Sequence, residues 1–395
     1  MKKVLVVVMC LVLAAAMFVG CTAAPAASET PAASESAAAS ESVAPSESAS
    51  EPVQSDESGD EAETGGVMKI VPEGDIVIGI STGSSGTSWR DIMIDNMKTV
   101  GDEYKEAGRI KDYKIVNNTT NGDANEQAQI LRQFVDDPEV NVIMVNPNDN
   151  TALSEVIADA QKAGKLVVVY DATAEAPGAL QVTLDHYAWN TKNVEAISKG
   201  AGGKGNAIEI SGLDGHPANN ERIRATQDVL KNYPDIKLLQ STPGGWDQTK
   251  AKEATAQILS SGQEIDIVYT QDGMAYGVLQ AFQDAGKLPK AMYGDPGTAF
   301  FKAWKELRDS GADFKAFSQP NPPGIGATAM RLAVNMAEGK DLDETKLDGN
   351  IYYYVVNSFY TDENFDEGWE QLKDQSDDYL LTEYFTEEQA LELFK

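Results

Sequence analysis

Short runs rich in valine and isoleucine alternate with amphipathic helical stretches between residues 76 and 318. This alternation predicts parallel sheets covered by helices on both faces, because parallel strands need a long crossover connection. The predicted strands lie at 76–80, 113–117, 142–145, 166–170, 181–184, 207–210, 236–240, 265–269, 291–293 and 315–318. The predicted helices lie at 89–107, 125–135, 151–163, 220–232, 249–260, 274–285 and 297–309.

The same four residues mark the end of a helix in each half of this pattern. Ala-Gly-Lys-Leu stands at 163–166 and again at 285–288. We expect Gly164 and Gly286 to take the left-handed conformation that ends many helices, which glycine adopts without steric cost. Two halves of one design predict an α/β fold with two similar lobes, each a parallel sheet flanked by helices, and a cleft between them.

The N-terminus has the layout of a secretory signal. Lys2 and Lys3 precede an apolar stretch at 4–19 that is too short to span a membrane, and Gly20 stands before Cys21. The series at 18–21 resembles the lipobox of bacterial lipoproteins, in which the thiol is acylated, although Phe18 replaces the usual leucine. We therefore expect a lipoprotein signal peptide at 1–20 and lipid attachment at Cys21. The alternative is an ordinary secretory signal with a chance cysteine.

A different composition follows the cysteine. Residues 22–66 contain ten acidic side chains and neither basic nor aromatic ones. Such a segment buries too little apolar surface to offset the entropy of ordering it, so we expect 21–66 to be a disordered acidic tether. As a flexible coil it would span about 40 Å. The other cysteine, Cys10, lies in the signal, so we expect the mature chain to contain no disulfide.

The charge of the remaining chain excludes some partners. The chain has 62 acidic and 32 basic side chains, a net charge of −30. Ten of the acids lie in the tether and two of the bases in the signal, which leaves −22 for residues 67–395. Nucleic acids and anionic lipid surfaces require a basic surface, so neither is an expected partner of this part.

Polar and aromatic side chains gather directly after the predicted strands, where open parallel sheets bind their ligands. These candidate residues are Ser84, Trp89, Arg90, Asn148, Asp149, Asp171, Arg222, Trp246, Asp272 and Asp295. Carboxylates and amides bond hydroxyl pairs, a guanidinium donates in a fork, and an aromatic face covers C–H groups, so the set suits a polyhydroxylated ligand. Two alternatives stay open. An aspartate after a strand often caps the next helix, and a tryptophan often packs between a loop and a lobe.

At these residues the chain resembles the ribose-type sugar-binding receptors of bacterial ABC importers, the type I periplasmic binding proteins. The resemblance runs from about residue 75 to residue 339. It rests on the stretches 80–81, 89–90, 145–149, 170–171, 212–222, 246–247, 271–275, 294–295 and 318–320. It implies that Trp89 and Trp246 sandwich a sugar ring. The residues that would bond its hydroxyls are Arg90, Asp149, Asp171, Arg222, Asp272, Asp295 and Gln319.

The resemblance also implies three crossing segments that form a hinge. The candidates are 184–185, 319–321 and 354–357, the last following a helix at 326–338. The first lobe would then hold 67–185 plus 320–350, and the second 186–319 plus 351–395. The capping box at 386–389 predicts a final helix; we expect the acidic tail to pack along a lobe.

Two departures from the family leave the identity of the ligand open. Ala172 follows Asp171 where the family often has arginine, and His186 stands where asparagine is common. We expect Arg222 and Asp295 to face a solvent-filled cleft, so that alanine at either position would abolish binding without unfolding the chain.

The pattern does not favour catalysis. His186 and His216 are the histidines of the chain and have no paired spacing for a metal, so we expect neither a metal nor a cofactor. A Gly-x-Ser-x-Gly elbow is absent, and the loop at 83–88 lacks the lysine of a Walker motif and the glycine spacing of a dinucleotide site. A transcriptional repressor with a two-lobed core would need a basic helix-turn-helix near its N-terminus. This chain instead has the expected signal and acidic tether there.

Our hypothesis is a monomeric, extracytoplasmic receptor, lipid-anchored to the bacterial cell membrane. It would capture a small neutral sugar or polyol between two lobes and deliver it to the permease of an ABC importer. One alternative is a receptor for a cationic or nucleoside-like small molecule. Another is a secreted carbohydrate-active enzyme.

Overall fold

The computed structural model describes residues 66–84, 86–117 and 122–395, and the structural statements below concern these residues. The expected signal peptide, Cys21 and almost all of the expected tether lie outside them. Within the described residues, no helix combines the length and the apolar character needed to cross a membrane.

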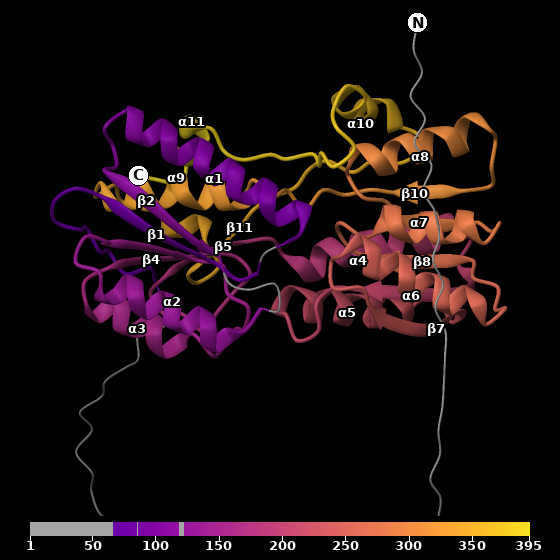
Figure 1. The fold of residues 1–395 in the computed structure, drawn as a ribbon, viewed down its shortest axis with the longest axis horizontal. Helices are drawn as coiled ribbons and strands as arrows, with labels where there is room; N and C mark the ends of the chain where they lie inside the picture. The colour runs from indigo at the N-terminus through magenta and orange to yellow at the C-terminus, as the bar shows by residue number, and fades with distance from the viewer. Residues whose placement is uncertain (1–65, 85, 118–121) are drawn as a thin grey trace, which may run out of the picture. The chain divides into compact units, whose positions relative to one another are not determined.

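The first sheet has six parallel strands in the order β11-β5-β4-β3-β1-β2 (Figure 1). Its strands are β1 (Val77–Thr82), β2 (Asp112–Asn117), β3 (Val142–Val145), β4 (Leu166–Asp171), β5 (Leu180–Thr183) and β11 (Ile351–Tyr353). The helices that cover it are α1 (Ser88–Glu106), α2 (Ala124–Asp136), α3 (Ser154–Lys162) and α9 (Ile325–Ala337). In Figure 1, α1 and α9 cover one face of this sheet and α2 and α3 the other. This sheet with its helices is the first lobe.

The second sheet has five parallel strands in the order β10-β9-β8-β6-β7. Its strands are β6 (Lys204–Ser211), β7 (Asp235–Pro243), β8 (Ile267–Thr270), β9 (Ala291–Tyr293) and β10 (Lys315–Phe317). Its helices are α4 (His186–Gly200), α5 (Pro217–Leu230), α6 (Gln248–Ser260), α7 (Ala275–Asp284) and α8 (Thr298–Asp309). Helix α4 packs on α5 and contacts β8, β9 and β10, while α6 packs on α7. This sheet with its helices is the second lobe.

The inner strands of the first sheet, β1, β3, β4 and β5, are buried on both faces. In β4, Leu166, Val168 and Tyr170 join one apolar cluster, whereas Val167 and Val169 join another on the opposite face. Successive side chains of a strand point to opposite faces, so a strand covered on both sides must be apolar throughout. This burial explains why β4 is a continuous apolar run in the sequence.

The strand and helix predictions agree closely with the structure. All ten predicted strands are present with small shifts of their ends, and so are the seven predicted helices and the helix predicted at 326–338. Gly164 and Gly286 have φ of 75° and 66°, which confirms the left-handed helix ends. The capping box of Thr386 and Gln389 opens α11 (Glu387–Leu391), as predicted. The predicted helices did not include α4 or α10 (Phe365–Leu372), and the predicted strands did not include β11.

The chain passes between the two sheets at the three expected places. It leaves β5 at Thr183 and enters α4 at His186, and it leaves β10 at Phe317 and enters α9 at Ile325. The third passage follows Tyr353, the end of β11, and leads to Tyr360, whose backbone pairs with Ser318 after β10.

The division of the C-terminal residues differs from our expectation, which placed 351–395 in the second lobe. Strand β11 pairs with β5 and therefore belongs to the first sheet. Helix α10 does pack on α8 of the second lobe, but α11 packs on α9 of the first. The tail is thus shared between the lobes, because its apolar side chains find partners in both cores: Phe365 in the second, Ala390 and Leu393 in the first.

Candidate ligand-binding site

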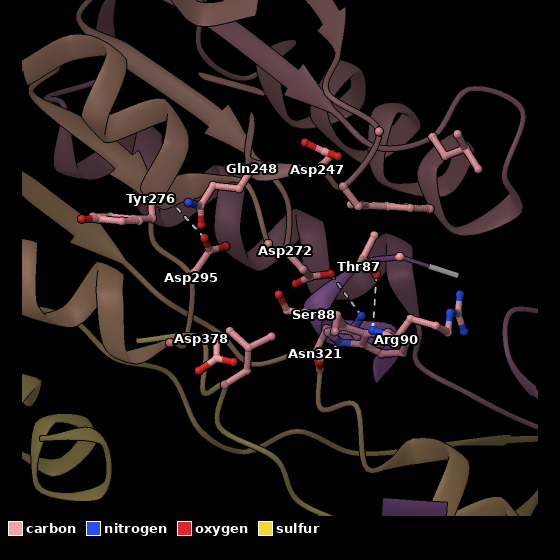
Figure 2. Close-up of a pocket in the computed structure, with 18 of the residues that line it drawn as sticks. Thr87, Ser88, Arg90, Asp247, Gln248, Asp272, Tyr276, Asp295, Asn321 and Asp378 are labelled. Carbon is pink, nitrogen blue, oxygen red and sulfur yellow. Dashed lines mark hydrogen bonds between the residues drawn. The ribbon is translucent and has the colours of Figure 1, made fainter. Parts of the chain in front are cut away.

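A cavity of about 500 Å³ lies where the carboxyl ends of both sheets meet (Figure 2). Its volume is ordinary for a small-molecule site. Eight of the eleven expected binding residues line it. They are Ser84, Trp89, Arg90 and Asp171 of the first lobe and Arg222, Trp246, Asp272 and Asp295 of the second.

Trp89 stands in the first turn of α1, at the wall that the first lobe contributes. Thr87 caps this helix, its hydroxyl accepting the backbone N–H of Arg90 at 3.3 Å. The indole Nε1 of Trp89 donates to the backbone oxygen of Asn321, at 2.7 Å, in the passage between β10 and α9. The half-buried ring lines the cavity with its N–H occupied, and the Arg90 guanidinium lies over it with Cζ 5.2 Å from the ring centroid.

Trp246 lies in the loop between β7 and α6, on the wall of the second lobe. Its Nε1 donates to Oε1 of Gln271 at 2.9 Å. The ring of His216 meets it edge to face, with centroids 4.8 Å apart. A Cβ added at Gly212 would lie 2.3 Å from the indole, so only glycine permits this close approach. Trp246 is thus held on several sides while still lining the cavity.

Backbone strain is concentrated at the cavity. In the described part of the chain, the non-glycine residues with positive φ are Asp171 at 67° and Trp246 at 55°. Such conformations cost on the order of 1–3 kcal/mol each and persist where the surrounding structure enforces them, often at ligand sites. Both residues line the cavity, one from each lobe.

Asp171 is a buried carboxylate at the end of β4. Its Oδ2 accepts Nδ2 of Asn146 at 2.8 Å and lies 3.7 Å from Nη1 of Arg90. Burial raises the pKa of the Asp171 carboxyl, whereas the Arg90 charge and the Asn146 hydrogen bond oppose that rise. The first lobe therefore presents one cation and one carboxyl group side by side.

Arg222 and Asp272 form the corresponding pair in the second lobe. Nη1 of Arg222 lies 2.7 Å from Oδ2 of Asp272. The other carboxylate oxygen accepts the hydroxyl of Tyr293 at 3.2 Å. The guanidinium is 1% exposed and stacks over Trp189 with its Cζ 4.4 Å from the ring centroid. Arg222 is therefore a fixed part of the cavity floor, and the expectation that it projects into a solvent-filled cleft was wrong.

His186 connects the two pairs. Its Nδ1 lies 3.1 Å from Nη2 of Arg222, and its Nε2 lies 3.2 Å from the backbone oxygen of Asp171. A guanidinium only donates, so Nδ1 must accept, and Nε2 therefore carries the proton that is donated to Asp171. Burial and the Arg222 charge hold the pKa of His186 well below its usual value, which keeps the ring neutral. The sequence singled out His186 only as a departure from the family, yet it lines the cavity.

Asp295 follows β9 and keeps an unused oxygen. Its Oδ2 accepts the backbone N–H of Tyr276 at 3.2 Å, as the dashed line in Figure 2 shows. Its Oδ1 is buried and has no hydrogen-bond partner among the described residues. Burial is the main reason that the pKa of Asp295 rises to about 7. A carboxyl group with one free oxygen in a cavity is suited to bind a ligand hydroxyl.

None of the three aspartates caps the helix that follows it, although Asp295 accepts a first-turn N–H of the preceding helix α7, that of Tyr276. Helix α4 is capped by Asp185, whereas α7 and α8 start without a side-chain cap. Asp171, Asp272 and Asp295 instead make the contacts described above. Asp247, which we had not singled out as a ligand residue, caps α6 by accepting the N–H of Lys250 at 2.9 Å.

Three expected residues do not line the cavity. Asp149 accepts the backbone N–H groups of Thr151 and Ala152, both at 2.8 Å, and so shapes its own loop. Asn148 is buried behind Gly83, where a Cβ would lie 2.5 Å from its Oδ1. Gln319 is buried, and its backbone oxygen accepts the Tyr293 hydroxyl at 3.1 Å.

The cavity also has walls that the sequence did not indicate. Tyr276 and Asn321 line it, and so do Asp377, Asp378 and Leu380 from the C-terminal tail. The tail is acidic and aromatic and contains no local sequence motif typical of a ligand site. The sequence therefore did not predict that its residues line the cavity. The described residues contain no cluster of three or more His, Cys, Asp or Glu side chains that could hold a metal ion.

The family described as "Periplasmic binding protein domain" matches residues 78–341. The chain belongs to this family. The match covers both sheets apart from the first residue of β1 and the short β11, and it ends before α10 and α11. The predicted resemblance and the two-lobed α/β fold are therefore confirmed, and the family is one of binding proteins rather than enzymes.

Individual relatives agree with the family. The xylitol-binding protein of Mycolicibacterium smegmatis is 30% identical over 199 residues, which are 50% of this chain and 56% of that protein. The D-allose-binding periplasmic protein of Escherichia coli is 28% identical over 252 residues, 61% of this chain and 79% of that protein. An ABC transporter solute binding protein of Thermobispora bispora has a crystal structure with 27% identity and a TM-score of 0.71, covering 80% of this chain and 94% of that one.

Proposed function

We propose that this chain is an extracytoplasmic lipoprotein that captures a small neutral sugar or polyol between its two lobes and delivers it to an ABC importer. The observation that carries the proposal is the pair of tryptophans in the cavity. The indole N–H groups of Trp89 and Trp246 are both occupied by protein oxygens, so the rings offer faces rather than donors. Aromatic faces suit the C–H side of a sugar ring, and the acids around them suit its hydroxyls.

The charges of the cavity support a neutral ligand. Arg90 lies beside Asp171, and Arg222 is paired with Asp272, so each guanidinium already has a carboxylate neighbour. An anionic ligand would have to compete with these carboxylates for the guanidinium groups, and a desolvated charge without a partner is unfavourable. Hydroxyl groups both donate and accept, so they can add to such pairs without displacing them.

The membrane location and the delivery step rest on the sequence and the relatives. The series at 18–21 resembles a lipobox, and the acidic segment after it would tether the lobes to a lipid at Cys21. One relative is named a periplasmic protein and another an ABC transporter solute binding protein. Delivery to a membrane permease is the role that this combination supports best.

A thermal-shift panel tests the ligand class. The probes are D-ribose, D-allose, xylitol and myo-inositol, with adenosine and choline as representatives of the nucleoside-like and cationic alternatives. A ligand at 100 times its Kd stabilises the folded chain by about 2.7 kcal/mol. We expect a sugar or polyol to raise the melting temperature and the other two to leave it unchanged. A shift with adenosine or choline, and none with the four sugars and polyols, would contradict the proposal.

A further inference from the structure

The C-terminal tail forms backbone hydrogen bonds with the start of α8, beside the cavity. The N–H of Thr298 donates to the oxygen of Tyr379 at 3.0 Å, and the N–H of Ala299 donates to the oxygen of Asp377 at 3.2 Å. Leu380 forms an antiparallel bridge with Gly297. The first N–H groups of a helix have no partner inside it, and α8 has no side-chain cap. The tail therefore supplies the capping oxygens of this helix.

The tail passes from one lobe to the other within a single peptide unit. The N–H of Leu381 donates to the oxygen of Pro296 in the second lobe at 2.8 Å. The hydroxyl of the next residue, Thr382, accepts Nδ2 of Asn96 in α1 of the first lobe, also at 2.8 Å. In Figure 1 this stretch runs between α10 and α11. It is a fourth passage between the lobes, in addition to the three that the sequence predicted.

Both ends of this passage are anchored. On the first lobe, Glu387 of α11 accepts Nη1 of Arg109 at 2.7 Å and Nδ2 of Asn335 at 3.1 Å. On the second lobe, Nζ of Lys302 in α8 lies 2.6 Å from Oδ1 of Asp377. Residues 377–380 are consequently held in place by contacts on either side. Their side chains at the cavity are those of Asp377, Asp378 and Leu380.

The two side chains that the anchoring leaves available differ in chemistry. Asp378 is an exposed carboxylate that accepts hydrogen bonds from the Ser376 side chain and from its own backbone, and a carboxylate has acceptor sites beyond these two. Figure 2 shows it on a different side of the cavity from Asp247. Leu380 is half-buried and packs against Gly297, where a Cβ would lie 2.6 Å from its Cδ2. An acceptor next to an apolar surface matches a hydroxyl next to the C–H groups of the same ring.

We propose that residues 377–380 form a third wall of the binding site, in which Asp378 accepts a ligand hydroxyl and Leu380 packs on the ligand's C–H surface. The tail then takes part in choosing among sugars and polyols. This wall lies beyond the residues that match the family, which end at 341. The inference rests on the proposed sugar- or polyol-binding function.

Calorimetric titration of the full chain with D-ribose, D-allose, xylitol and myo-inositol tests this wall. The variants are Asp378→Asn, which removes the charge but keeps the size, and Leu380→Ala, which leaves the backbone bridge to Gly297 possible. Matched controls in the tail are Asp374→Asn, which is exposed and does not line the cavity, and Leu391→Ala, 39% exposed on α11. The melting temperature of each unliganded variant monitors folding.

We expect Asp378→Asn and Leu380→Ala each to weaken the best ligand by at least about fivefold, the size of one lost hydrogen bond or apolar contact. We also expect the ratio of Kd values between ligands to change, which a purely structural tail would not cause. The controls should stay within about twofold of the unaltered chain. If the unaltered chain binds a probe and all four variants bind it equally well, the third wall is wrong and the proposed function stands. If the unaltered chain binds none of the probes, the proposed function is wrong and this inference falls with it.

Discussion

Asn321 donates its Nδ2 to Oδ2 of Asp272 at 3.1 Å, the same oxygen that lies 2.7 Å from Nη1 of Arg222. Asn321 belongs to the passage between the lobes, and its backbone oxygen also accepts the indole N–H of Trp89 at 2.7 Å. One residue of a crossing segment thus connects a cavity tryptophan of the first lobe with the buried ion pair of the second. Hydrogen bonds of Asn321 therefore join the segment that connects the lobes to the residues of the binding site.

Replacing Arg222 with alanine is expected to unfold the chain more readily as well as to abolish binding. The change leaves Asp272 buried without its cation and removes the packing on Trp189. Breaking a buried pair in this way costs about 3–5 kcal/mol. Urea denaturation measures the loss.

Arg224→Ala is the matched control for that experiment, because Arg224 lies two residues further along α5 in an exposed pair with Glu221. An exposed pair contributes less than about 1 kcal/mol. Equal stability losses for Arg222→Ala and Arg224→Ala would contradict the structural role assigned to the buried pair.

Trp246→Ala is expected to weaken sugar or polyol binding by at least about tenfold, equivalent to about 1.4 kcal/mol, because it removes one aromatic face of the cavity. Calorimetric titration with the best ligand of the panel measures the change. The control is Trp369→Ala, a half-buried tryptophan on α10 that stacks on Phe365 and does not line the cavity. An affinity that falls equally in both variants would point to a general loss of structure.

Asp295 is expected to make the chain less stable as the pH rises from about 4 to about 7. Burial raises its pKa to about 7 from the ordinary value of 3.8, so the folded chain binds a proton in this window that the unfolded chain has lost. The stabilising effect is complete below the unfolded pKa and is lost as the pH rises through the folded one, with a slope of at most about 1.4 kcal/mol per pH unit.

Unfolding free energies of the unaltered chain and of Asp295→Asn, measured between pH 4 and pH 8, isolate this contribution, because the amide does not titrate. The unfolding free energy of the unaltered chain, relative to that of Asp295→Asn, should fall as the pH rises from about 4 to about 7. Glu209→Gln is a control away from the cavity, since burial also raises the pKa of Glu209. It should alter the pH dependence of stability but leave sugar affinity intact. A difference between the unaltered chain and Asp295→Asn that is independent of pH would refute the shifted pKa.

Replacing Cys21 with serine is expected to release the chain from bacterial membranes, because a hydroxyl cannot take the place of the acylated thiol. Fractionation of cells into membrane and soluble parts measures the outcome. Cys10→Ser is the control, since Cys10 lies inside the expected signal and should not affect anchoring. A Cys21→Ser chain that stays in the membrane fraction would show that the anchor lies elsewhere.

The amino-acid sequence alone was enough to predict the sheets and the general place of the site. Continuous apolar runs such as that of β4 reveal a strand buried on both faces, and parallel strands must end at a common edge, so the residues after each strand converge. For this reason the sequence alone predicts six residues that do line the cavity: Trp89, Asp171, Arg222, Trp246, Asp272 and Asp295. Local rules also identified the helix ends at Gly164 and Gly286.

The arrangement of the tail and the pairing of the charges depended on contacts between residues far apart in the sequence. Strand β11 has only three residues, too few for a periodic pattern, and it joins the first sheet because β5 offers it an open edge. Asp149 and Asp378 are both acids that accept hydrogen bonds within their own loops, yet of the two only Asp378 lines the cavity, and nothing local to either residue distinguishes them. Arg222 became a buried partner of Asp272, fifty residues away, because the fold places them together. Patterns among residues close in the sequence determine the helices and strands. Which side chains come into contact depends on how helices and strands that are far apart in the sequence pack together.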